Sequence, residues 1–122
     1  MAAARPHRSP RRRQAQRETA AAGKCAALLK ALAEPERLRI VQALRERPQS
    51  VSDLAALLDN EVGNISHHLK ILRRQGIVAP RREGKSIIYS LAAHVFAERS
   101  STTDRLDLGC CRLEFPKPEG TP

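Results

Sequence analysis

The sequence predicts a mainly α domain that closes with a β-hairpin, an α+β arrangement, and three observations support this fold class. Apolar residues recur with a helical period of about 3.6 in four segments between residues 19 and 75. A polar turn separates the last two of these segments. After Gly76 the apolar period changes to about 2, which is typical of β-strands.

The first two predicted helices precede Pro48, which ends the second one. In the Ala-rich segment 19–32, helical spacing places Cys25 and three leucines on one face. In the next segment, 34–46, Pro35 suits the first helical position because its missing N–H would have no partner there. An apolar stripe follows it, so this helix is expected to pack on a core.

The third and fourth helices are closely linked. Ser50 and Asp53 have the spacing of a capping box, in which each side chain accepts a hydrogen bond from the other's backbone N–H, ahead of a helix at 51–58. A polar turn at 59–61 leads to an amphipathic helix at 62–75, which the next glycine ends. Two helices joined by a tight turn, the second one basic, form a helix-turn-helix arrangement.

Segment 77–91 predicts a β-hairpin that would form a basic wing beside the fourth helix. Two β-rich runs flank Glu83 and Gly84, and basic residues lie at the tip. Pro80 lacks an amide hydrogen, so its strand is expected at a sheet edge. A short helix at 92–98 and a less regular tail are expected to follow.

The chain is expected to form one domain with tails, because 122 residues are too few for two domains. We predict a disordered basic arm at 1–18, a winged helix-turn-helix domain for DNA binding and dimerisation at 19–99, and a tail with a vicinal cysteine pair at 100–122. An organellar transit peptide is the alternative for the arm, although Pro6 and Pro10 disrupt the amphipathic helix that it requires.

The net charge of +9 is concentrated in two segments. Residues 1–17 contain six Arg and no acidic residue, and residues 62–85 contain six Lys or Arg and one Glu. Such concentration is typical of a nucleic-acid binder. Two Phe, one Tyr and no Trp offer few rings for stacking on single strands or RNA, so double-stranded DNA is the expected partner.

Composition also limits location and chemistry. No apolar run of about 18 residues occurs and no secretory signal is evident, so no membrane segment or export is expected. Three cysteines, an odd number, favour reduced thiols in a cytoplasm over a disulfide framework. No carboxylate pair, nucleophile–base set or phosphate-binding glycine loop is evident, so an enzyme is not expected.

The adjacent His67 and His68 suggest a metal site, but helix geometry argues against it. Neighbouring residues diverge by about 100° on a helix, whereas chelation needs an offset of three or four residues. Val62, Ile65 and Leu69 define the core face, so His68 is expected to pack partly buried beside it. His67 is expected to face the groove of DNA; the alternative is a basic helix that is merely solvated.

Four segments, EPERLRIVQAL, DLAALL, NISHHLKILRRQGIV and RREGKSIIYSL, carry a family resemblance over about residues 31–91. In order and spacing they resemble the winged helix-turn-helix repressors of the ArsR/SmtB (arsenical and metal-responsive) family. The resemblance implies a homodimer on a palindromic operator, with recognition helices in successive major grooves and wings on flanking phosphates. It also implies a dimer interface between the first helix and the segment after the wing, and release from DNA when a metal or metalloid binds.

Nine residues are candidates for DNA contact, on the chemistry of their side chains and on this resemblance. Short polar groups can reach base edges, while Lys and Arg can reach phosphates. The nine are Asn64, Ser66, His67, Lys70, Arg73 and Arg74 on the fourth helix and Arg81, Arg82 and Lys85 on the wing.

Two metal sites of the family are not expected in this chain. Ser50 and Ser52 stand at the two cysteine positions of the ELCVCDL motif that many arsenic and cadmium sensors carry, and serine cannot supply a thiolate. The zinc-sensing members use a D-x-H and an H-x-x-E set on the last helix. Here His94 and Glu98 lie nearby without the partner residues.

The three cysteines are the remaining candidates for a sensor. Adjacent Cα atoms lie about 3.8 Å apart, too close for an ordinary disulfide, so Cys110 and Cys111 are better suited to share a soft ion such as As(III), Cu(I), Cd(II) or Hg(II). If the first helix and the tail meet across the dimer, as the resemblance implies, Cys25 completes a three-sulfur site from two subunits. Otherwise Cys25 is a buried apolar side chain and the pair consists of incidental tail thiols.

Two alternatives stay open for function. Oxidants or persulfides could join Cys25 to Cys110 or Cys111, which would make the chain a redox-responsive repressor. The chain could also be an architectural or protein-interaction module that uses a winged helix without any inducer.

Overall fold

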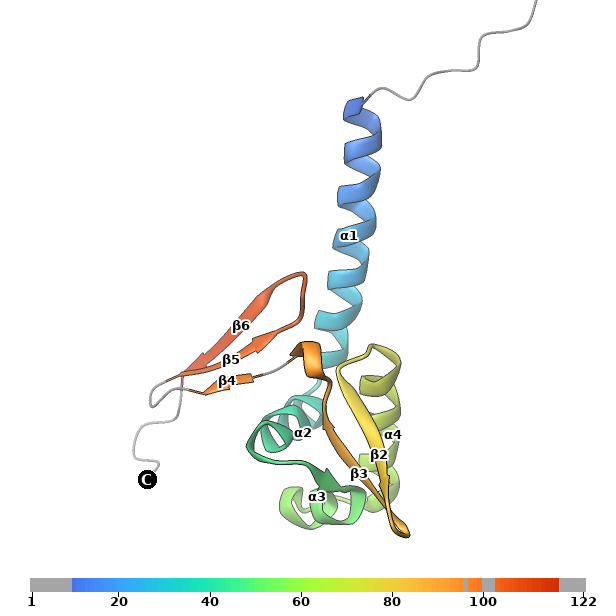
Figure 1. Cartoon of the computed structure of the whole chain (residues 1–122), viewed down its shortest axis with the longest axis vertical. Coiled ribbons are helices and arrows are strands. Elements are labelled where there is room, and N and C mark those ends of the chain that lie inside the picture. The colour runs from blue at the N-terminus through green and yellow to red at the C-terminus, as the bar shows by residue number, and fades with distance from the viewer. Residues whose placement is uncertain (1–9, 96, 100–102, 117–122) are drawn as a thin grey trace, which may run out of the picture.

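The computed structural model describes residues 10–95, 97–99 and 103–116. The elements in chain order are α1 (Pro10–Leu32), α2 (Pro35–Glu46), β1 (Gln49–Ser50), α3 (Val51–Leu58), α4 (Val62–Arg74), β2 (Val78–Glu83), β3 (Ser86–Leu91), the 3-10 helix η1 (Ala93–Val95), β4 (Ala97–Arg99), β5 (Thr103–Asp107) and β6 (Arg112–Pro116). Two antiparallel sheets have the strand orders β1-β3-β2 and β4-β5-β6. Figure 1 shows α2, α3 and α4 gathered with the first sheet, α1 projecting from this body, and the second sheet beside the lower part of α1.

The core lies where α2, α3 and α4 meet the first sheet. Ile40, Leu54, Ile65, Leu69 and Leu72 are each 0% exposed, so the predicted core face of the fourth helix is confirmed. The prediction is wrong for Val62, which is the first residue of α4 and is 52% exposed. Burial of each large apolar side chain contributes about 1.5–3 kcal/mol of hydrophobic free energy.

The predicted helix ends are confirmed at several positions. Pro35 lies in the first turn of α2, and the Ser50 hydroxyl accepts a hydrogen bond of 3.1 Å from the backbone N–H of Asp53. Gly76, with φ 72°, follows the end of α4, in the left-handed region that glycine adopts without strain. These local signals mark the start of α2, the start of α3 and the end of α4.

The predicted hairpin is also confirmed. β2 and β3 pair in register from Val78 opposite Leu91 to Glu83 opposite Ser86, with a two-residue turn between them. In the described part of the chain β2 lies at the edge of its sheet, as the proline within it predicted. The hairpin follows α4 directly, so it lies beside that helix as a wing (Figure 1).

The helix α1 begins earlier than predicted. It starts at Pro10 rather than near Thr19, so the prediction of disorder over 1–18 is wrong for residues 10–18, while residues 1–9 lie outside the described residues. Proline suits the first helical position, and the Arg, Gln and Ala residues that follow are strong helix formers. A hydrogen bond of 3.2 Å from Gln14 to Glu18, one turn along, supports the added segment.

The region after the wing differs most from the prediction. Instead of a helix at 92–98 and an irregular tail, the chain forms the short η1 and the three strands of the second sheet. The physical reason is that buried and more exposed side chains alternate along this segment, as they do in a strand with one face on a core. Leu106 is 1% and Leu108 4% exposed, and Leu106 lies opposite Leu113 in the sheet. Asp104, also on the buried face, obscured this alternation in the sequence.

A buried ion pair attaches the second sheet to α2. Arg45 of α2 and Asp104 of β5 lie 2.6 Å apart, and their side chains are 9% and 5% exposed. Since removing one partner from such a pair leaves a buried charge uncompensated, the pair constrains where the sheet lies relative to α2. The tail is therefore part of the folded domain.

Candidate DNA-binding surface and thiol cluster

The polar face of α4 points away from the core. Asn64, His67 and Lys70 are exposed, and Ser66 is half-buried beside the core face. The two arginines that end the helix, Arg73 and Arg74, are exposed as well. Short polar groups near the start of the helix and long cations toward its end form a surface that can meet base edges and phosphates.

The two histidines diverge as predicted. Their ring centroids lie 5.7 Å apart with planes tilted by 55°, and the His67 side chain is exposed. His68 is partly buried: its Nδ1 lies 3.3 Å from the Arg37 guanidinium and 3.8 Å from the Glu34 carboxylate. The ring therefore packs between the start of α2 and α4, where it helps to hold the fourth helix against the second.

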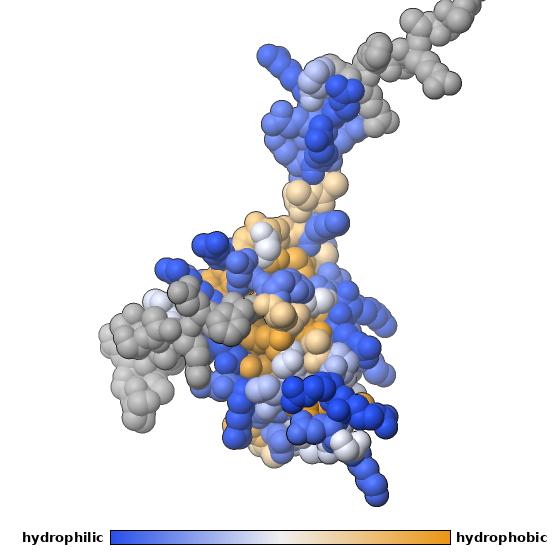
Figure 2. Space-filling view, viewed as in Figure 1, coloured by the Kyte–Doolittle hydropathy of each residue, from blue (hydrophilic) through white to orange (hydrophobic). Residues whose placement is uncertain are grey.

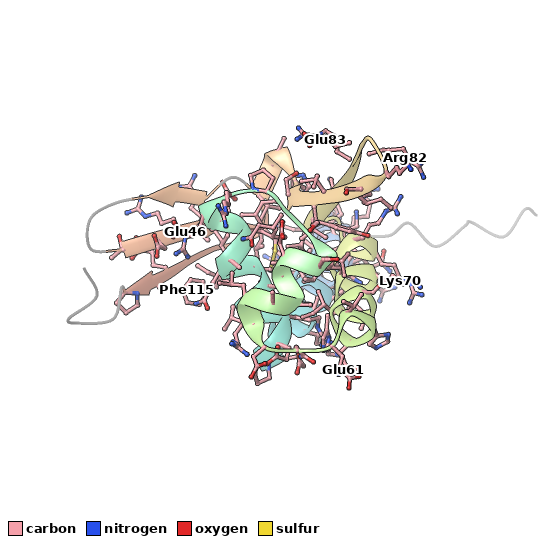
Figure 3. The ribbon with its side chains drawn as sticks, turned by 90° about the horizontal axis from the view of Figure 1, so that it is seen from below. Glu46, Glu61, Lys70, Arg82, Glu83 and Phe115 are labelled. Atoms are coloured by element: carbon pink, nitrogen blue, oxygen red, sulfur yellow. A yellow bond between two sulfur atoms is a disulfide. The ribbon has the colours of Figure 1, made fainter. Side chains whose placement is uncertain are left out.

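The wing carries exposed basic side chains at its tip. Arg81, Arg82 and Lys85 are all exposed, and Arg81 forms an ion pair of 3.2 Å with Glu83 on the same strand. Figure 3 shows Arg82 of the wing and Lys70 of α4 projecting on the same side of the molecule. One duplex could therefore meet both elements.

The three cysteines come together within one chain. Cys25 of α1 forms a disulfide with Cys110, which lies 85 positions further along, with a Cα–Cα distance of 5.7 Å. Cys111 is free, and its Sγ lies 3.9 Å from that of Cys110. All three sulfur atoms lie within 4.8 Å of one another. These residues are called the thiol cluster below.

The thiol cluster corrects the expectation that all three thiols are reduced, because Cys25 and Cys110 are joined by a disulfide. The tail folds back onto the α1 helix of its own chain and brings the three sulfur atoms together there, while completion of the site by a second subunit stays a prediction. Cys25 is half-buried and bonded rather than a purely apolar core residue. The vicinal residues Cys110 and Cys111 form no disulfide with each other, in agreement with the distance argument.

The turn between β5 and β6 positions the pair. Gly109 has φ 85° and donates its N–H to the Asp107 carboxylate at 2.8 Å, while the N–H of Leu108 donates to the carbonyl of Cys111 at 2.9 Å. Cys110 is exposed at the tip of this turn and Cys111 packs against the core. Arg112, the residue after the pair, lies 3.6 Å from the Asp107 carboxylate. Sequence reasoning missed this turn, whose signals were the Asp-Leu-Gly segment and the flanking alternation.

Thiolate sulfur is the donor that soft ions prefer, and three such atoms within 4.8 Å could bind one ion once the disulfide is reduced. Among the described residues, this is the group of Cys, His, Asp and Glu side chains close enough to hold a metal. His94 lies on η1, where it is exposed. In the described part of the chain, no helix is long and apolar enough to cross a membrane.

The comparisons with known proteins agree with this geometry. Residues 34–79 match the arsR family of bacterial regulatory proteins. The regulator NmtR of Mycobacterium tuberculosis is 40% identical over 96 residues, which are 75% of this chain and 80% of NmtR. The repressor SmtB of the same organism is 43% identical over 70 residues, 57% of this chain and 52% of SmtB, so the match spans about half of that relative. A solved homodimeric winged helix-turn-helix DNA-binding domain from Mycobacterium bovis aligns with TM-score 0.62 and 28% identity, over 73% of this chain and 77% of that one.

A tight helix-turn-helix, an exposed basic second helix and a basic hairpin beside it define a winged helix-turn-helix DNA-binding protein. The chain belongs to the ArsR family of bacterial regulatory proteins. It is a transcriptional regulator and not an enzyme.

Proposed function

We propose that the chain is a cytoplasmic homodimeric repressor that binds a palindromic operator and is released when the thiol cluster changes state. The proposal rests on two features that occur together in one small domain. One is α4, an exposed basic helix, called the reading helix below. The other is the set of three sulfur atoms within 4.8 Å of one another, which join α1 to the tail. The reading helix supplies DNA binding, and the sulfur atoms supply a chemical input.

The dimer is supported by α1. Residues 10–24 of this helix are exposed along their whole length, and Leu29, closer to the body, is still 39% exposed. Figure 2 shows hydrophilic side chains at the outer end of α1 and a more apolar stretch where the helix approaches the body. A second copy packed there would cover this stretch, and two reading helices would then address two half-sites. The solved relative from Mycobacterium bovis is described as homodimeric.

We propose that different residues contact the bases and the phosphates of DNA. Asn64, Ser66 and His67 would contact base edges, because they lie in the first turns of α4 and have short polar side chains. The cations of the helix end and of the wing would contact phosphates and supply affinity without sequence preference. These phosphate candidates are Lys70, Arg73, Arg74, Arg81, Arg82 and Lys85.

The input would be a soft metal or metalloid ion, such as As(III), Cu(I) or Cd(II), bound by the reduced thiol cluster. Cys25 lies on the helix that packs against α2 and α4, whereas Cys110 and Cys111 lie in the turn between β5 and β6, whose sheet is attached to α2. An ion held by all three would fix α1 relative to the sheet. If that arrangement disfavours the DNA-binding spacing of the two reading helices by a few kcal/mol, the operator is released.

The Cys25–Cys110 disulfide favours a second input, oxidation. In this alternative an oxidant removes two electrons from the two thiols, two protons leave, and the bond joins the same two segments without an ion. Both inputs use the same position in the fold. They differ in their need for Cys111, which is free in the disulfide form.

That difference provides the experiment. A labelled duplex, selected with the reduced protein from a random-sequence library, is followed by fluorescence anisotropy during titration with As(III), Cu(I) and Cd(II), and separately with peroxide. Metal sensing predicts that Cys111→Ser lowers the ion response at least about tenfold and leaves the peroxide response intact. Cys25→Ser is expected to abolish the response to the ions and the response to peroxide, whether the input is a metal or oxidation.

The outcomes test the three-sulfur site, the metal input and the repressor function separately. If Cys111→Ser and the native chain respond equally to every ion, the three-sulfur site is wrong. If peroxide alone releases DNA, the redox alternative replaces metal sensing. If the native chain selects no sequence from the library, the repressor function itself is wrong.

A further inference from the structure

Asn64, proposed above to read a base edge, is held by a chain of hydrogen bonds that begins on α2. Its Nδ2 donates to Oδ1 of Asn60 at 3.1 Å. Asn60 lies in the turn between α3 and α4, and its Nδ2 donates to the Glu36 carboxylate at 3.0 Å. Glu36 also accepts a hydrogen bond of 2.8 Å from Arg39. The chain thus runs from a cation on α2 to an exposed amide at the start of the reading helix.

The amide of Asn60 can adopt only one orientation in this series of hydrogen bonds. The backbone N–H of Glu61, 2.8 Å away, can only donate, so the atom that it meets must be the oxygen of Asn60. At the other end, an ionised carboxylate can only accept, so Glu36 must meet the nitrogen. Hydrogen bonds from Asn60 first, and then from Arg39 with its charge, lower the pKa of Glu36, which keeps this carboxylate ionised at neutral pH.

The orientation passes to the next amide. Oδ1 of Asn60 can only accept, so the atom of Asn64 that faces it must be the Nδ2 donor. The carbonyl oxygen of Asn64 is therefore directed away from the turn, on a side chain that is exposed. An asparagine without such a partner could turn either its oxygen or its nitrogen toward DNA, whereas the amide orientation of Asn64 is fixed before DNA binds.

We propose that Asn60 is a positioning residue that makes Asn64 present its carbonyl oxygen to the major groove, and so select a base whose exocyclic amino group lies in that groove. Such bases are adenine, through N6, and cytosine, through N4. Guanine O6 and thymine O4 are acceptors and would oppose the oxygen. The second hydrogen of Nδ2 is free for adenine N7, which favours adenine over cytosine. This inference rests on the proposed function, because it requires α4 to lie in the major groove.

The test is selection of duplexes from a random-sequence library by the full chain and by three variants. Asn64→Ala identifies the position that this side chain reads in each half-site. The native chain is expected to enrich adenine or cytosine there about tenfold over guanine and thymine. Asn60→Ala is expected to lose that preference, to about twofold or less, at the same position alone. The matched control Glu61→Gln alters the neighbouring exposed side chain but keeps its backbone N–H, so it should leave the preference unchanged.

A second measurement does not depend on the Asn60 variant folding. In the selected duplex, the adenine or cytosine is replaced by the analogue base that lacks the exocyclic amino group. Binding by the native chain is expected to weaken about tenfold, while Asn64→Ala binds both duplexes equally. Selection of guanine or thymine, an unchanged preference in folded Asn60→Ala, or indifference of the native chain to the analogue overturns the inference and leaves the repressor function standing. Failure of the native chain to select any sequence instead overturns the proposed function, and the inference with it.

Discussion

Opening the Cys25–Cys110 disulfide is expected to destabilise the domain by a large fraction of its stability. The bond joins residues 85 positions apart. In the chain-entropy treatment, closing a loop of that length removes about 15 cal/mol/K from the unfolded ensemble, which is about 4.6 kcal/mol at 25 °C. Stabilities of small domains are about 5–15 kcal/mol, so the loss is readily measured.

Guanidinium denaturation of oxidised protein, followed by circular dichroism, provides the assay. Cys110→Ser removes the bond, and Cys111→Ser is the matched control because it changes the neighbouring free thiol. The first variant is expected to lose about 4.6 kcal/mol of unfolding free energy, and a reductant should bring the native chain to the same level. Equal stability of the two oxidised variants would refute the reasoning, since the bond would then not close the loop.

Three other perturbations have defined outcomes. Asp104→Ala is expected to cost about 3–5 kcal/mol in urea denaturation, because the buried guanidinium of Arg45 then keeps only its longer ion pair of 3.6 Å with the exposed Glu46; joint replacement of Arg45 and Asp104 by apolar residues should recover most of the loss. Arg82→Ala should weaken binding to all duplexes and reduce the salt slope by about one, whereas His67→Ala should cost about 1–3 kcal/mol on the selected operator alone; equal losses on random DNA would contradict this division. Because the folded pKa of Glu36 is lowered from 4.5, its stabilisation is complete above that pH and is lost as the pH falls through the folded value, so the unfolding free energies of the native chain and Glu36→Gln should converge in acid.

Sequence patterns anticipated the helix-turn-helix and the wing because their signals are local. Helical periodicity identified the buried face of α4, and a serine, a proline and a glycine marked helix ends within one turn of where they lie. The change of period after Gly76 identified the hairpin in its correct place. Each of these features depends on residues at most a few positions apart, whose preferences tertiary contacts did not override.

The divergence of His67 and His68 was likewise settled by helix geometry alone, and the structure agrees. The same reasoning underestimated α1, because prolines and arginines near the N-terminus suggested disorder although the proline at position 10 is compatible with a helix start. Composition described the charge of that segment correctly but not its conformation.

The sequence by itself determined the reading helix, the wing and the basic charge on both, since periodicity, caps and composition are properties of neighbouring residues. Only the tertiary structure decided that Cys25, Cys110 and Cys111 meet in one chain, and that Asp104 pairs with Arg45. Those contacts join segments separated by more than fifty positions, and they form only because the tail builds a sheet that packs on the core. A pattern read along the chain carries no record of which distant segments will pack together, because that choice depends on the burial and pairing available to the whole domain.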